Sequence, residues 1–167
     1  THGVDAIACA ARSGIADFGE NYVGEALPKI AALADLALTW HFIGAIQSNK
    51  TAAIARNFQW VQTIDRVKVA QRLSAQRPED AGPLDVLIQI NIDAEPQKAG
   101  IAPAALAEFA PQLLSLPRLR LRGLMAIPRP VAEPTLMSAA FHRMHELFGT
   151  AKPAGEMHWD TLSMGMT

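Results

Sequence analysis

The chain has 167 residues, half of them hydrophobic, which is enough to bury the core of one globular domain over residues 1–167. A formal net charge of -1, with no block of like charges, argues against a nucleic acid or an anionic membrane as partner. The sequence has a single cysteine, no uninterrupted apolar run of about 18 residues and no signal-peptide pattern. We therefore expect a cytoplasmic protein without an intrachain disulfide.

Helix-like and strand-like segments alternate along the first half of the chain. We expect helices at residues 4–13, 23–36, 48–57 and 66–76, and strands at residues 15–19, 38–44 and 60–64. Cys9 lies in the apolar run of the first helix, so we expect a buried, inert thiol. Ser48 is a good N-cap residue, and we expect residues 47–50 to cap the following helix rather than to contact a ligand.

The second half continues the alternation. Residues 84–92 have the β-branched density of a strand that is covered on both faces, as in a parallel sheet. A helix at 103–116, a strand at 120–127, an amphipathic helix at 135–148 and a strand near 159–163 complete the pattern. Leu136, Ala140, Met144 and Leu147 form the apolar stripe of that amphipathic helix.

These elements predict the α/β fold class with a parallel sheet of six strands, each returning through a helix. A TIM barrel, (β/α)8, needs eight strands and roughly 250 residues. We therefore expect a single, incomplete barrel domain over 1–167, lacking the first strand and the last βα unit. An open doubly wound sheet of six strands is the alternative.

Two candidate binding residues lie at or near the carboxyl ends of predicted strands, where parallel α/β proteins bind ligands. Asn21 follows a strand that ends at Gly19, and its amide offers both donors and an acceptor. Either the Asn21 side chain binds a ligand, or it forms hydrogen bonds with the backbone of its own loop. His41 lies between Trp40 and Phe42, so strand alternation points it to the opposite face. There it is either a satisfied core residue or a partner for a planar ligand.

The best candidate for anion binding is the strand end formed by Ser163, Met164 and Gly165. A hydroxyl and successive backbone N–H groups can cradle a phosphate, although a plain tight turn would have the same composition. His142 and His145 are three residues apart on a helix, but no third ligand is evident, so we expect a solvated face and no metal site. No spacing indicates a Ser-His-Asp set or a carboxylate pair, so no catalytic residue is predicted.

Five short blocks, taken in chain order, carry a family resemblance that spans nearly the whole chain. They are Phe-Gly-Glu-Asn-Tyr at 18–22, Trp-His-Phe-Ile-Gly at 40–44 with Gln-Ser-Asn-Lys at 47–50, residues 86–92 with Lys-Ala-Gly-Ile at 98–101, Arg-Gly-Leu-Met at 122–125, and Leu-Ser-Met-Gly-Met at 162–166. Together they resemble the pyridoxal phosphate homeostasis protein family. That family is similar to the amino-terminal barrel domain of alanine racemase and lacks the racemase's second, β-rich domain.

The resemblance implies pyridoxal 5′-phosphate as cofactor, held as a Schiff base on a lysine at the end of the first barrel strand. Thr1 matches the residue after that lysine, so we expect the lysine immediately upstream of Thr1. The family's Gly-Ser-Thr phosphate loop and an arginine at the pyridine nitrogen are expected after Thr167. The resemblance places Asn21 and His41 in the wall around the ring, and Ser163 with the backbone of Met164 and Gly165 at the phosphate.

The implied function is to bind pyridoxal phosphate and to buffer or deliver it, with no robust catalysis, because an arginine at the ring nitrogen weakens the electron sink. The implied partners are the cofactor itself and apo-enzymes that use it, and we expect a monomer. The enzyme alternative is an amino-acid racemase or decarboxylase. Alanine-type racemisation commonly needs a tyrosine from the other domain, and Tyr22 is the only tyrosine. A third class is a barrel that binds another phosphorylated metabolite.

Overall fold

A computed structural model describes residues 2–129, 133–153 and 157–165, and its strands form one parallel sheet. The strands lie side by side in the order in which they occur along the chain. They are β1 (Asp17–Glu20), β2 (Thr39–Phe42), β3 (Trp60–Ile64), β4 (Leu84–Gln89), β5 (Leu119–Ala126) and β6 (Thr161–Met164).

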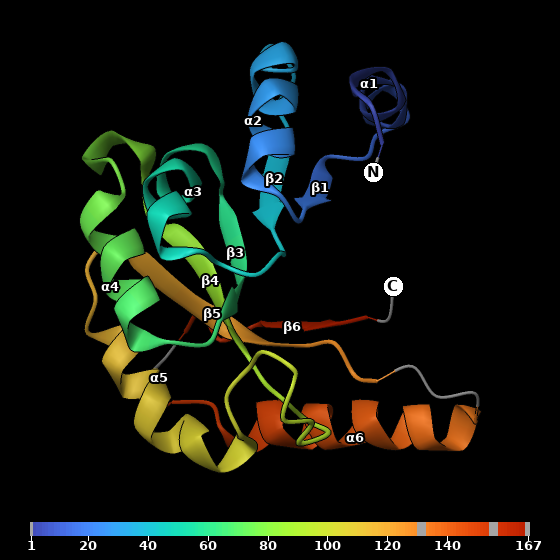
Figure 1. The fold of residues 1–167 in the computed structure, drawn as a ribbon, viewed down its shortest axis with the longest axis vertical. Helices are drawn as coiled ribbons and strands as arrows, with labels where there is room; N and C mark the ends of the chain where they lie inside the picture. Colours follow the sequence, from blue (N-terminus) through green and yellow to red (C-terminus); the bar gives the residue numbers. More distant parts are fainter. Residues whose placement is uncertain (1, 130–132, 154–156, 166–167) are drawn as a thin grey trace.

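Helices follow the outer side of this sheet, which curls into an open arc (Figure 1). They are α1 (Val4–Arg12), α2 (Val23–Ala32), α3 (Thr51–Asn57), α4 (Val67–Gln76), α5 (Leu106–Leu114) and α6 (Pro134–Thr150), with short turns η1 (Ser48–Lys50), η2 (Glu79–Ala81) and η3 (Pro103–Ala105). A doubly wound sheet reverses its strand order and carries helices on both faces. The sequential order and the outer helices exclude that alternative and confirm a partial (β/α) barrel.

The predicted elements are all present in the described residues, and the differences lie at their ends. The strand predicted at 84–92 stops at Gln89, because Ile90 forms an isolated bridge with Ile101 and Asn91 is bonded to the turn at Glu95. None of the described helices is long and apolar enough to cross a membrane.

Two local predictions are wrong. Ser48 does not cap α3, because the chain enters α3 through η1, which places Ser48 inside the helical segment; its carbonyl accepts a hydrogen bond from Thr51 Oγ1 at 3.0 Å. Cys9 is exposed. Helix α1 buries Ile7, and Cys9 lies two residues further on, about 200° around the helix, and so faces away from the core.

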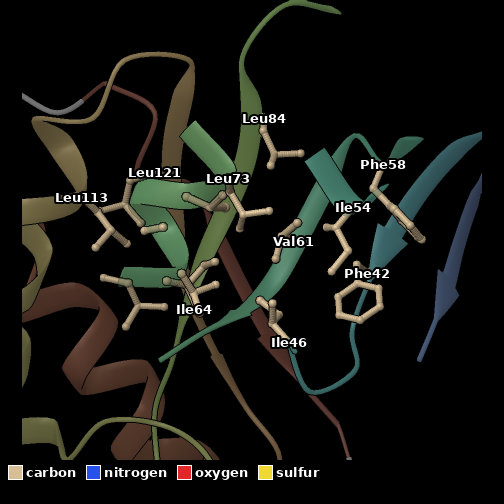
Figure 2. Packing of buried hydrophobic residues seen from close by; sticks show 14 of the residues in the cluster. Phe42, Ile46, Ile54, Phe58, Val61, Ile64, Leu73, Leu84, Leu113 and Leu121 are labelled. Atoms are coloured by element: carbon tan, nitrogen blue, oxygen red, sulfur yellow. The ribbon is translucent and has the colours of Figure 1, made fainter. Parts of the chain in front are cut away.

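The core lies between the outer face of the sheet and the helices. Figure 2 shows Phe42 and Val61 of the sheet near Ile54 of α3 and Leu73 of α4. In the same view Leu121 of β5 lies beside Leu113 of α5. Strand alternation turns the neighbouring residues toward the concave side of the arc. Those inward positions include several polar side chains: His41, Gln62, Asp85, Gln89, Arg120 and Arg122.

An ion-pair network occupies the concave side near the starts of β4, β5 and β6. Arg120 donates to both Asp85 carboxylate oxygens at 2.5 and 2.7 Å, and Arg122 donates to Asp160 through two bonds of 2.8 Å. Arg122 also reaches Asp85 at 3.3 Å. The hydrogen bond from Arg122 holds the pKa of the Asp160 carboxyl below its ordinary value, and the hydrogen bond with Asp85 raises the pKa of Arg120. This network ties the inner faces of three strands together.

Candidate functional site

A cavity of about 190 Å³ lies at the carboxyl ends of the strands, and we call it the rim cavity. Asn21, Ser163, Met164 and Gly165 all line it, although they come from opposite ends of the chain. The other lining residues are Ile43, Gln62, Met125, Ala126 and Ile127. The structure therefore brings together four of the five residues predicted to bind a cofactor.

Asn21 is positioned by a close backbone approach between the loops that follow β1 and β2. A Cβ atom on Gly44 would lie 2.0 Å from the Asn21 carbonyl oxygen, so only glycine fits at this position. Thr63 in β3 holds Gly44 from the other side by donating to its carbonyl at 2.7 Å. The exposed Asn21 side chain has no hydrogen-bond partner among the described residues, so the self-satisfied loop considered above is not what the structure shows.

Ser163 and Gly165 define the opposite wall. Ser163 lies within β6, and its hydroxyl donates to Gln62 Oε1 at 2.8 Å. The Gly165 N–H points at the Ala126 carbonyl at 3.4 Å, a long bond at the limit of useful geometry. The Met164 side chain is partly exposed at the mouth. A hydroxyl and a weakly engaged backbone N–H thus face the cavity region together.

His41 does not line the rim cavity, and it lies one hydrogen bond behind it. Its Nδ1 lies 3.0 Å from Gln62 Nε2, its Nε2 lies 3.0 Å from Asp17 Oδ1, and its ring stacks on Trp60 with 5.3 Å between centroids. Arg122 covers Trp60 at 4.8 Å from the ring centroid. His41 points to the face opposite Trp40 and Phe42, as alternation predicted, and that face is the concave one; it contacts the cavity wall only through Gln62.

Gln62 is the site residue that sequence reasoning missed. It occupies an inward position of β3, between Val61 and Thr63, which are both buried. The available signal was one amide side chain in a strand whose other residues are Trp, Val, Thr and Ile. That signal does not identify a partner, because Ser163 is 101 residues away in the sequence.

The pair His142 and His145 lies apart from this site, on exposed positions of α6. His142 Nδ1 lies 2.9 Å from the Ser138 carbonyl oxygen one turn earlier. The described residues contain no group of three His, Cys, Asp or Glu side chains arranged to hold a metal.

The sequential parallel sheet with a ligand-sized hollow at its carboxyl rim defines an α/β-barrel protein of the alanine racemase amino-terminal type. The family model described as alanine racemase, N-terminal domain, matches residues 1–167. The chain is 55% identical over 155 residues to the pyridoxal phosphate homeostasis protein of Pseudomonas aeruginosa, covering 93% of this chain and 66% of that protein. It is 49% identical to the protein of the same name from Pasteurella multocida, covering all of this chain and 73% of that one. The chain belongs to the pyridoxal phosphate homeostasis protein family.

Solved structures agree with this assignment. PipY of Synechococcus elongatus without pyridoxal phosphate has a TM-score of 0.90 and 34% identity, over 99% of this chain and 78% of that chain. PipY with pyridoxal phosphate bound has a TM-score of 0.79 and 33% identity, over 100% and 78% of the two chains. The chain thus spans about two thirds to four fifths of the relatives compared with it.

Proposed function

We propose that this chain binds pyridoxal 5′-phosphate at the rim cavity and serves vitamin B6 homeostasis by buffering or delivering the cofactor, without robust catalysis. The observation that carries the proposal is the meeting of Asn21, Ser163 and Gly165 at one hollow, from segments more than 140 residues apart. The relatives named for pyridoxal phosphate homeostasis, and PipY solved with the cofactor bound, support the choice of ligand.

The lining residues fit the two chemical parts of this cofactor. Ile43, Met125 and Ile127 offer apolar surface to a flat ring, while the Asn21 amide can donate or accept at its polar edge. The Ser163 hydroxyl and the backbone N–H groups at 164 and 165 can donate to a phosphate. A cavity of about 190 Å³ is smaller than the roughly 300 Å³ at which pockets for drug-sized ligands begin, and so suits a compact ligand.

When bound, the cofactor supplies an aldehyde that condenses with a primary amine. No lysine is among the described residues that line the rim cavity. Lys29 is buried in an ion pair with Glu20 at 2.5 Å, and Lys98 is paired with Glu95 at 2.8 Å. The family resemblance implies a lysine as the covalent anchor, and the described residues of the rim cavity would orient the ring and hold the phosphate.

The proposal extends to the setting in which the protein acts. We expect a cytoplasmic monomer that passes the cofactor to apo-enzymes, and the partly exposed rim, with Asn21 and Met164 open to solvent, is consistent with such transfer. Sedimentation would report the monomer. Mixing the loaded protein with an apo-enzyme and following the recovery of that enzyme's activity would report delivery.

The decisive experiment uses the protein expressed from its complete gene and pyridoxal phosphate. Intact mass before and after borohydride reduction is expected to show one cofactor retained covalently per chain. Affinity for pyridoxine 5′-phosphate, which has no aldehyde, then measures the noncovalent contacts of the rim cavity alone. Ser163→Ala should weaken this affinity about tenfold, since a hydrogen bond to a charged group contributes about 1.5 kcal/mol or more.

Ser115→Ala is the matched control, because Ser115 is exposed at the end of α5 and does not line the rim cavity. Equal affinities in the wild type and in Ser163→Ala would contradict the assignment of Ser163. Colourless protein without a reducible adduct would instead indicate a barrel for another phosphorylated metabolite. Interconversion of D- and L-amino acids at rates typical of dedicated racemases would favour the enzyme alternative.

A further inference from the structure

A chain of hydrogen bonds crosses the concave side of the sheet from β1 to β6. It runs from Asp17 to His41, from His41 to Gln62, and from Gln62 to Ser163, with distances of 3.0, 3.0 and 2.8 Å. We call these four residues the relay. Its last member, Ser163, lines the rim cavity beside Gln62, and its first, Asp17, has a side chain that is 70% exposed. The relay therefore runs from the cavity, across β3 and β2, to β1.

The donor and acceptor at each bond of the relay follow from the chemistry of an amide. The NH₂ end of Gln62 can only donate, so the His41 Nδ1 that it faces carries no proton. The proton of the neutral imidazole is then on Nε2, where it is donated to the Asp17 carboxylate. The carbonyl end of Gln62 can only accept, so Ser163 must donate its hydrogen to it. In this state the Ser163 hydrogen points away from any ligand.

A second proton on His41 reverses that order. Both ring nitrogens then donate, so Gln62 must turn its carbonyl end toward His41 and its NH₂ end toward Ser163. Ser163 accepts that bond, and its own hydrogen becomes free to donate to a phosphate oxygen in the cavity. Asp17 is the charged group directly against His41. Arg122 lies beyond Trp60 on the stacked face, with its charge matched by Asp85 and Asp160.

We propose that Gln62 is a positioning residue whose amide reverses when His41 gains a proton, so that the Ser163 hydroxyl turns from the relay to the phosphate of the ligand. The inference rests on the proposed function, because it requires a phosphate at Ser163. By linkage, phosphate binding and proton uptake by His41 then favour each other equally. Release of the ligand is coupled to loss of that proton.

Two substitutions of Gln62 separate this mechanism from a merely structural role, using pyridoxine 5′-phosphate and the protein expressed from its complete gene. Gln62→Met removes both polar ends and leaves the Ser163 hydrogen free at every pH. Gln62→Glu keeps the shape, but a carboxylate only accepts, so it retains the Ser163 hydrogen at every pH. Gln112→Met is the control, since Gln112 is exposed on α5 and bonds only within that helix.

The wild type and the control should bind the ligand more tightly at pH 6 than at pH 8.5. At both pH values, Gln62→Met should bind the ligand with an affinity within about threefold of the wild-type affinity at pH 6. The only pH dependence left in this variant should be that of the ligand's own phosphate. Gln62→Glu should bind about tenfold more weakly than the wild type at pH 6, as expected for a lost bond to a charged group, and should match the wild type at pH 8.5. A structural role would weaken both variants alike.

Proton uptake gives the direct measurement. Calorimetric titrations in buffers of different ionisation enthalpy count the protons taken up with the ligand. The phosphate's own second pKa, near about 6, contributes equally to every variant. The wild type should take up more protons with the ligand than Gln62→Met. Equal uptake in the two proteins, with the ligand still bound, would overturn the relay and leave the proposed function standing. Failure of all proteins, wild type included, to bind the ligand would overturn the proposed function itself.

Discussion

Substitution of Gly44 by alanine tests how the rim cavity is built. The new Cβ atom would lie 2.0 Å from the Asn21 carbonyl oxygen and 2.7 Å from its carbonyl carbon, whereas ordinary van der Waals contact begins at 3.4 Å. The obstacle is backbone, which cannot rotate away as a flexible side chain can. The loop that carries Asn21 must therefore retreat, or Gly44 must pull away from the Thr63 hydroxyl that holds its carbonyl.

The expected cost follows from those two contacts. Overpacking at a buried position costs about 1–3 kcal/mol, and the Thr63 hydrogen bond contributes about 1 kcal/mol more if it breaks. We expect Gly44→Ala to lose about 2–3 kcal/mol of unfolding free energy, which corresponds to a fall in Tm of roughly 4–12 °C for a chain of this size. Affinity for pyridoxine 5′-phosphate should fall as well, because Asn21 is displaced from the cavity wall.

Gly24→Ala is the matched control for this prediction. A Cβ atom on Gly24 meets nothing within 4 Å, and Gly24 lies in the first turn of α2, where alanine favours the helix by up to about 1 kcal/mol. This variant should be as stable as the wild type or slightly more so. Thermal unfolding and calorimetric binding measure both effects. Wild-type stability and affinity in Gly44→Ala would refute the account of how Asn21 is placed.

Three further substitutions test the framework. Arg77 is buried and donates hydrogen bonds to the carbonyls of Ala55, Phe58, Ala81 and Gly82. Arg77→Met should therefore lower the free energy of unfolding, measured in urea, by about 3 kcal/mol. A loss below about 1 kcal/mol would show that these bonds contribute little to stability. Gly123 has φ +146°, and a Cβ atom there would lie 2.0 Å from the Thr161 carbonyl oxygen. Gly123→Ala should therefore weaken the pairing of β6 with β5 and speed amide hydrogen exchange at residues 161–164. Unchanged protection of these amides would contradict this prediction. Arg122 holds the pKa of Asp160 below its ordinary value, so this carboxylate stabilises the fold above the unfolded-state pKa of about 4, and the contribution is lost as the pH falls through the lower folded-state pKa. Asp160→Asn should make urea stability fall less steeply in that acid range, by under about 1 kcal/mol because the side chain is half exposed, and equal slopes would refute the linkage.

The sequence by itself determined the elements and their order. Residues 60–64 form a strand with the predicted bounds, because alternation and turn chemistry act over a few residues. The same local logic located Asn21 and Ser163 at strand ends, since a polar residue at the end of an apolar run is a short-range signal. The prediction for Ser48 was wrong because it depended on how the chain enters α3. The prediction for Cys9 was wrong because it depended on which side of α1 faces the core.

Only the tertiary structure decided which strand ends share a cavity and how they are connected. Gln62 and Ser163 belong to strands with two others between them in the sheet, and their side chains meet only because the sheet curls. The approach of Gly44 to Asn21 follows instead from the pairing of β1 with β2, and the contact of His41 with Gln62 follows from the pairing of β2 with β3. The twist that curls the sheet accumulates over all six strands. No window of the sequence contains that curvature, whereas each window contains the periodicity of its own strand or helix.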